Sequence, residues 1–136
     1  MTSVHIPARI RAEMLAHAQA EAPNECCGLL IGEGSLIDES LPARNVDPEP
    51  TRRYLLDPRE HIAANRRLRG TPRQVLGCYH SHPRSPAVPS ATDLAEALYP
   101  DFVWVIVSLA AAKEDNVAAY RLTGAGFVPV TIVAAL

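Results

Sequence analysis

The sequence predicts one α/β domain, spanning residues 1–136, in which helices flank a mixed β-sheet. Segments with apolar residues at helical spacing alternate along the chain with short apolar runs of strand length. No internal repeat and no low-complexity segment is present, which argues against an array of repeated units. A chain of this length buries about two-thirds of its unfolded surface, so a core forms without disulfides or a structural metal.

The first half of the chain predicts one helix and several strands. Residues 7–23 (PARIRAEMLAHAQAEAP) carry apolar side chains at helical spacing between prolines that suit a helix start and stop. Residues 25–33 (ECCGLLIGE) form a short apolar run typical of a buried strand, and a second strand is expected after Gly34. Residues 39–51 hold three prolines among charged residues and predict a surface loop, which leads into a short strand at residues 53–56.

The second half alternates helices with longer strands. Pro58 follows Asp57 and suits the first turn of a helix that ends near Arg69. The loop at residues 83–89 contains three prolines, which predicts that it holds its shape. The remaining expected elements are a buried strand at 74–81, a helix at 90–100 that Ser90 opens, and strands at 102–109, 117–122 and 127–133.

Composition excludes several classes of partner. Thirteen basic and fifteen acidic residues give a net charge of −2, which creates no field that attracts nucleic acid or an anionic membrane. The longest apolar run, residues 102–112, is too short to span a bilayer, and the N-terminus lacks the apolar region of a secretory signal. The three cysteines make an odd count with an adjacent pair, so no disulfide framework is expected and the reducing cytoplasm is the expected compartment.

Two histidines and an aspartate make a candidate metal site. His80 and His82 stand two residues apart at the end of a predicted strand, so both imidazoles face the same side. Asp93 follows in the first turn of the next helix, where a carboxylate also suits the helix dipole. Two nitrogens and one oxygen are a ligand set that catalytic zinc sites use. The ligand types also admit iron, cobalt or nickel, and zinc is preferred on availability and precedent.

Two further residues are candidates for catalysis. A catalytic zinc ion lowers the pKa of its water to ~7, and amide hydrolysis then needs a base that passes the proton to the leaving amine. Glu25 is the candidate base, because it is an isolated acid beside an apolar run. Ser90 is the candidate hydrogen-bond donor to the oxyanion, a contribution of roughly 3–4 kcal/mol in comparable sites. Ser90 and Asp93 also match a helix-capping pair, and both roles are compatible.

The spacing of these residues resembles a known signature. Glu25 is followed far downstream by H-S-H-P at residues 80–83, and then by P-S-x-x-D at residues 89–93. This pattern resembles, without a gap, that of the JAMM (MPN+) zinc metalloprotease family, and the resemblance covers nearly the whole chain. It implies the deaminase-like α/β/α sandwich that the family shares.

The resemblance also implies a role for each residue. His80, His82 and Asp93 correspond to ligands of one zinc ion, Glu25 to the general acid and base, and Ser90 to the group that stabilises the oxyanion. Family members cleave amide or isopeptide bonds after the C-terminal diglycine of ubiquitin-like proteins. The small bacterial members, which this chain resembles most, act on ubiquitin-like sulfur-carrier proteins by releasing cysteine or trimming the C-terminus. The leaving group and the oligomeric state stay open.

Three alternative functions would use the same fold or some of the same residues. The same fold occurs in non-enzymatic MPN-type binding modules, although these lack one or more of the ligands that are all present here. A zinc deaminase would need H-x-E and P-C-x-x-C motifs, which are absent. A cysteine hydrolase would use Cys26, Cys27 or Cys78, but all three lie in predicted apolar strands, where a thiol behaves as a small hydrophobe.

An arginine-rich stretch has two possible interpretations, as a solvated surface or as a contact for a partner. Seven arginines lie between residues 52 and 73, against only Asp57 and Glu60. Such a run is usually a solvated surface. The alternative is that these arginines contact acidic residues of a carrier protein.

Overall fold

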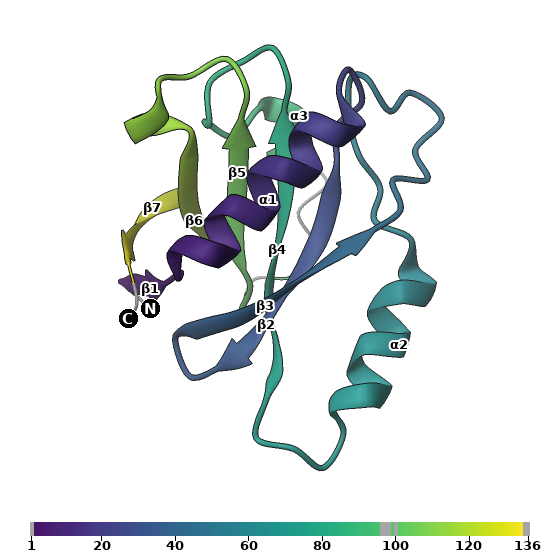
Figure 1. Cartoon of the computed structure of the whole chain (residues 1–136), viewed down its shortest axis with the longest axis vertical. Helices are drawn as coiled ribbons and strands as arrows, with labels where there is room; N and C mark the ends of the chain where they lie inside the picture. The colour runs from purple at the N-terminus through teal and green to yellow at the C-terminus, as the bar shows by residue number, and fades with distance from the viewer. Residues whose placement is uncertain (1, 96–98, 100, 135–136) are drawn as a thin grey trace.

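The computed structural model describes residues 2–95, 99 and 101–134, which form seven strands, three α-helices and one short 3₁₀ turn (Figure 1). The helices are α1 (Ala8–Glu21), α2 (Pro58–Leu68) and α3 (Ala91–Ala95). The strands are β1 (Ser3–His5), β2 (Cys27–Glu33), β3 (Leu36–Ala43), β4 (Gln74–His82), β5 (Val103–Ser108), β6 (Val117–Thr123) and β7 (Gly126–Val133). Within the described part of the chain, no helix has the length and apolar character that crossing a membrane requires.

The strands follow one another in the order β1-β3-β2-β4-β5-β6-β7. β4 and β5 are parallel, as are the pairs that β1 makes with β3 and β7, whereas the other neighbours are antiparallel. β1 pairs with both ends of this order and closes the sheet on itself, although its contact with β3 is the single pair His5 and Leu36. The predicted mixed sheet is therefore confirmed.

Helices pack on both faces of the sheet because its central strands are apolar on both sides. α1 lies across one face (Figure 1), where Met14 belongs to a buried cluster that includes Leu30 and Val105. On the opposite face, Ala64 of α2 belongs to a second cluster with Cys78 and Trp104. His80 and His82 point to the α2 side, since the period of two puts them on the same face as Cys78.

Three sequence predictions need correction. β1 was not predicted, because three residues carry too little pattern to recognise. β3 runs through residues 39–43, which were expected to be loop, and its Pro42 is tolerated where β3 has β2 as its only strand neighbour. The strand predicted at 53–56 is wrong: this segment contributes only an isolated bridge between Asn45 and Leu56. The helix predicted at 90–100 is α3 over its first part, and residues 96–98 and 100 lie outside the described residues.

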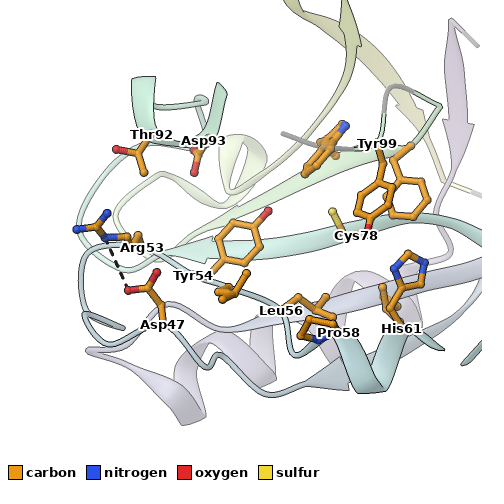
Figure 2. Close-up of a pocket in the computed structure, with 14 residues that line it drawn as sticks. Asp47, Arg53, Tyr54, Leu56, Pro58, His61, Cys78, Thr92, Asp93 and Tyr99 are labelled. Atoms are coloured by element: carbon orange, nitrogen blue, oxygen red, sulfur yellow. Dashed lines mark ion pairs between the residues drawn. The ribbon is translucent and has the colours of Figure 1, made fainter. Parts of the chain in front are cut away.

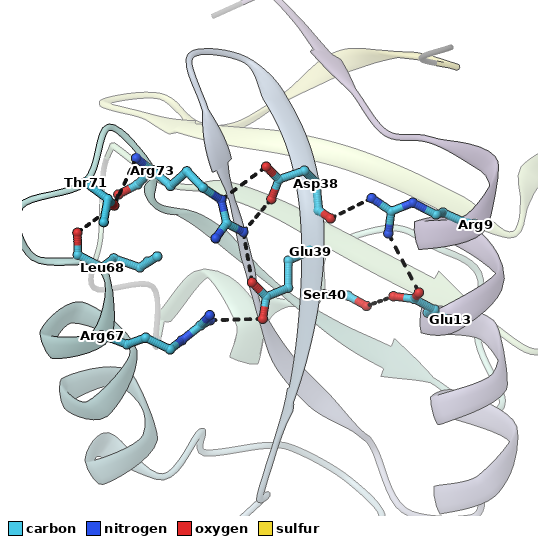
Figure 3. A network of polar contacts seen from close by, with 9 residues as sticks. All are labelled: Arg9, Glu13, Asp38, Glu39, Ser40, Arg67, Leu68, Thr71 and Arg73. Carbon is cyan, nitrogen blue, oxygen red and sulfur yellow. Dashed lines mark hydrogen bonds and ion pairs between the residues drawn. The ribbon is translucent and has the colours of Figure 1, made fainter.

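The arginine-rich stretch is largely paired within the chain (Figure 3). Arg73 donates to Asp38 and Glu39 at 2.6 and 2.9 Å, and Arg67 donates to the same Glu39 at 2.9 Å. Further pairs join Arg52 and Arg53 to Glu49, and Arg59 to Asp57. These contacts favour the interpretation of the stretch as a salt-bridged, solvated surface. Each exposed pair there adds only about 0–1 kcal/mol to the free energy of unfolding.

Gly77 allows β4 and β5 to lie close together, which gives a testable prediction. A Cβ at this position would lie 2.0 Å from the Val103 carbonyl oxygen, a backbone atom that cannot move aside alone. Gly77→Ala should therefore lower the free energy of unfolding by about 1–3 kcal/mol or more. Urea unfolding measures the change. Gly124→Ala is the matched control, since a Cβ there meets no atom within 4 Å, and equal stability of the two variants would contradict the packing argument.

Candidate metal centre

β4 delivers both histidines to one buried point. β4 pairs with β2 on one side and with β5 on the other, so its carboxyl end is held between two strands. His80 is 2% exposed and His82 is 5% exposed. Their Nε2 atoms lie 3.1 Å apart, as expected for alternate residues of one strand that face the same side.

Asp93 completes the group from the first turn of α3. Its Oδ1 lies 3.2 Å from His80 Nε2, and its Oδ2 lies 3.1 Å from His82 Nε2. Ser90 fixes this carboxylate through a reciprocal cap: the Ser90 N–H donates to Asp93 Oδ2 at 2.9 Å, and the Asp93 N–H donates to Ser90 Oγ at 3.0 Å. The expected cap therefore forms and aims Asp93 at the histidines.

The three side chains fit a tetrahedral metal ion. Zinc bonds of ~2.0–2.1 Å to nitrogen and oxygen place neighbouring ligand atoms about 3.3 Å apart, close to the separations of 3.1–3.2 Å seen here. Two imidazole nitrogens that face each other at this distance need a cation or a proton between them. Among the described residues, His80, His82 and Asp93 form the group whose geometry could hold a metal ion. The three ligands expected from the sequence thus come together.

The surroundings shift the pKa of each of the three side chains. Burial lowers the pKa of His80 despite the neighbouring Asp93, which keeps its imidazole neutral. Burial alone would also lower the pKa of His82, but its contacts with Asp93 and Pro86 and the charges of Asp93 and Glu25 raise it. Burial opposes ionisation of Asp93, yet the hydrogen bonds from both imidazoles hold its pKa well below the usual range. The Asp93 carboxylate is therefore negatively charged.

The proline-rich loop after β4 orients His82. His82 Nδ1 donates to the Pro86 carbonyl at 2.9 Å, which leaves Nε2 directed at His80 and Asp93. The loop itself is anchored because Ser108 Oγ donates to the Ser85 carbonyl at 2.6 Å and the Tyr120 hydroxyl donates to the Ala87 carbonyl at 2.7 Å. These contacts explain how the loop holds a fixed shape beside the ligands.

Glu25 lies next to the candidate metal site. β2 and β4 pair Cys27 with His80, and the Ser81 N–H donates to the Cys26 carbonyl at 3.0 Å, so continuing the register puts Glu25 opposite His82. Glu25 is 8% exposed, and its negative charge contributes to the raised pKa of His82. The backbone of Glu25 is fixed by its N–H, which donates to the Pro50 carbonyl at 2.7 Å.

An apolar cavity of about 460 Å³ opens beside Asp93 (Figure 2). Leu29, Phe102 and Trp104 contribute apolar walls, and the ring of Tyr54 lies between Asp93 and Cys78 in this view. Sequence reasoning missed Tyr54, because no local pattern links it to the residues of β4 more than twenty positions away. Asp93 lines this cavity, so the candidate metal site borders an open space.

Family comparison agrees with this geometry. Residues 7–123 match the family model described as prokaryotic homologs of the JAB domain. The chain belongs to this family. The resemblance to JAMM (MPN+) proteins is thereby confirmed.

Three curated relatives of this JAB-domain protein are informative. It is 35% identical to a desampylase from Haloferax volcanii, an alignment that covers 93% of this chain and 94% of the relative. It is 36% identical to the CysO-cysteine peptidase of Mycobacterium tuberculosis, over 80% of this chain and 75% of the relative. It is 37% identical to a protein named "Probable TtuB-protein conjugate cleaving protease" from Thermus thermophilus, in an alignment that covers 69% of this chain and 63% of the relative.

Solved structures agree on the fold. Protein DSY2949 from Desulfitobacterium hafniense is 33% identical and superposes on the JAB-domain protein with a TM-score of 0.86, covering 97% of this chain and 92% of that chain. A JAB1/MPN domain protein from Archaeoglobus fulgidus is 23% identical and superposes with a TM-score of 0.63, covering 98% of this chain and 100% of that chain. The family fold expected from the sequence is confirmed.

The cysteines of this JAB-domain protein are unsuited to nucleophilic catalysis. All three are free and buried, and burial raises the pKa of Cys26 to about 11 and that of Cys78 to about 12. Burial also raises the pKa of Cys27. Iodoacetamide at pH 8 should therefore leave the native thiols unmodified and hydrolysis unchanged, since the thiolate is the reactive form. Mass spectrometry checks this against a urea-unfolded control in which all three react, and rapid loss of activity would contradict it.

Proposed function

We propose that this protein is a zinc-dependent peptidase that hydrolyses an amide bond after the C-terminal diglycine of a ubiquitin-like sulfur-carrier protein. One observation carries the proposal: His80, His82 and Asp93 converge on one point with Glu25 beside them. The names of two relatives, CysO-cysteine peptidase and TtuB-protein conjugate cleaving protease, support carrier-linked cysteine or a carrier–protein bond as the substrate class.

One zinc ion per chain fits the site, held by His80 Nε2, His82 Nε2 and the Asp93 carboxylate. Bound zinc supplies a Lewis acid that activates water and polarises a carbonyl at neutral pH. Glu25 takes the proton from the attacking water and delivers it to the leaving amine. Ser90 Oγ donates a hydrogen bond to the oxyanion that develops on the carbonyl oxygen. The cavity beside Asp93 gives the substrate access to these groups.

The proposed reaction is tested with defined carrier substrates. The zinc-loaded protein is incubated with ubiquitin-like carriers whose C-terminal diglycine is extended either by cysteine or by an isopeptide-linked lysine peptide. Mass spectrometry should find the carrier ending at its second glycine, and a chelator should abolish the product. Matched carriers with valine in place of the second glycine should resist cleavage. Intact substrates after incubation with fully loaded protein would overturn the proposal.

Ser90→Ala separates the cap from the catalytic role. If Ser90 donates to the oxyanion, kcat of the zinc-saturated variant should fall by about 10²–10³-fold. Loss of the cap alone costs about 1 kcal/mol of stability and loosens Asp93, which weakens zinc affinity but leaves kcat at saturating zinc unchanged. Ser90→Thr keeps a hydroxyl and should retain most of the turnover. A wild-type kcat for zinc-saturated Ser90→Ala would refute the oxyanion role.

A non-enzymatic binding module is not favoured, because the chain retains all three candidate ligand side chains in one place and two of the relatives compared above are named as a peptidase and a protease. The three free, buried cysteines support the reducing cytoplasm as the compartment in which the protein works.

A further inference from the structure

Tyr54 covers the face of one metal ligand. Its ring stacks on the imidazole of His80, with ring centroids 4.3 Å apart and an angle of 20° between the planes. The Tyr54 hydroxyl faces the thiol of Cys78, two residues before His80 on β4 (Figure 2). The ring is therefore fixed against β4 at two points although it comes from a distant segment.

The two histidines are oriented by different means. A ligating imidazole is usually held by a hydrogen bond at its second nitrogen, and the Pro86 carbonyl provides this for His82. Among the described residues, no such bond to His80 Nδ1 is found, and the stacked phenol instead restricts rotation of that ring. Stacking keeps the plane of His80 aligned so that Nε2 points at His82 and Asp93.

Asn45 holds the segment that carries Tyr54. Its Nδ2 donates to the Arg53 carbonyl at 3.1 Å and its Oδ1 accepts from the Leu55 N–H at 3.0 Å, so one side chain clamps the backbone on both sides of Tyr54. The same Nδ2 also donates to the Glu25 carbonyl at 3.0 Å. Asn45 thus connects the backbone around Tyr54 with the backbone of the residue proposed as the base.

We propose that Tyr54 and Asn45 are positioning residues of the metal centre. Tyr54 holds the His80 ring in the orientation that binds the metal, and Asn45 fixes Tyr54 and Glu25 relative to one another. This inference rests on the proposed function, because it assigns roles toward the zinc ion of that site. Neither residue acts on substrate, and both act through the groups that they hold.

The first test replaces Tyr54 and measures zinc affinity by competition with a chromophoric chelator, which needs no substrate. Tyr54→Leu removes the stacked ring and should weaken zinc binding by about 10–100-fold, the usual effect of losing a ligand's supporting contact. Tyr54→Phe keeps the ring and should bind zinc like the wild type. Val46→Ala, an exposed change in the same segment, is the control and should also bind like the wild type.

Cobalt substitution separates positioning from a general loss of stability. The visible spectrum of bound Co²⁺ should change in Tyr54→Leu and stay unchanged in Tyr54→Phe, because the spectrum reports ligand geometry. If Tyr54→Leu fails to fold, Asn45→Asp carries the test, since it keeps the acceptor oxygen and removes the donors to Arg53 and Glu25. Asn45→Asp should weaken zinc binding and lower kcat of the zinc-saturated protein.

The outcomes distinguish this inference from the proposed function. Wild-type zinc affinity and an unaltered cobalt spectrum in folded Tyr54→Leu, or in folded Asn45→Asp, would overturn the positioning role and leave the peptidase proposal standing. Weakened binding in Tyr54→Phe equal to that in Tyr54→Leu would also overturn it, because stacking would then not be the cause. Failure of the wild type to bind zinc would instead overturn the proposed function, and this inference with it.

Discussion

Glu25→Gln should bind zinc with wild-type affinity while its turnover falls by about 10²–10⁴-fold, the range expected when a general acid and base is lost. Glutamine keeps the size of the side chain and removes its ability to carry a proton. Glu25 does not belong to the group that could hold the metal, so the site should load normally. Chelator competition measures the affinity, and steady-state kinetics on a diglycine substrate measures the turnover.

An exposed carboxylate at the far end of β2, the strand that begins two residues after Glu25, provides the control for Glu25. Glu33 ends β2 and is solvent-exposed, so Glu33→Gln makes the same chemical change away from the centre and should leave both quantities unaltered. Wild-type turnover in Glu25→Gln would remove the base assignment. Loss of zinc in Glu25→Gln would show instead that Glu25 supports the ligands.

The second large effect is expected from removal of a ligand. His80→Ala leaves one imidazole and one carboxylate, and kcat/KM should fall on the order of 10³-fold or more, because the Lewis acid contributes several kcal/mol to the transition state. Chelator-treated wild type should fall to the same level. Added zinc should restore the wild type and leave the variant inactive.

Thermal unfolding gives an independent readout of the same ligand. Zinc at about 100 times its dissociation constant should stabilise the wild type by about 2.7 kcal/mol, and the same zinc concentration should not stabilise His80→Ala. His5→Ala is the control, since His5 lies in β1, outside the candidate ligand group. Full activity of His80→Ala after exhaustive chelation would contradict metal catalysis.

The convergence of the three candidate ligands was predictable because its signals are local. The period of two places His80 and His82 on one face, and the cap between Ser90 and Asp93 is a pattern of four residues. The three prolines in the loop at residues 83–89 likewise predict that this loop holds its shape. Each of these features depends on a few neighbouring residues, so it can be recognised in the sequence without knowledge of the fold.

The missed features depend on contacts between distant segments. Asn45 contacts the backbone of Glu25, and Tyr54 stacks on His80, but no spacing in the sequence connects these residues. The prolines around residues 42–50 favoured a loop, whereas β3 continues through Pro42 because that stretch pairs only with β2. The apolar residues at 53–56 suggested a strand, yet Tyr54, Leu55 and Leu56 line the cavity instead.

The proposed function requires that two imidazoles and one carboxylate bind a single zinc ion. Zinc X-ray absorption spectroscopy of protein loaded with one equivalent tests it directly. The spectrum should show only nitrogen and oxygen neighbours at ~2.0–2.1 Å, with fewer imidazole contributions in His80→Ala. Sulfur neighbours at ~2.3 Å, or a spectrum that His80→Ala leaves unchanged, would contradict it.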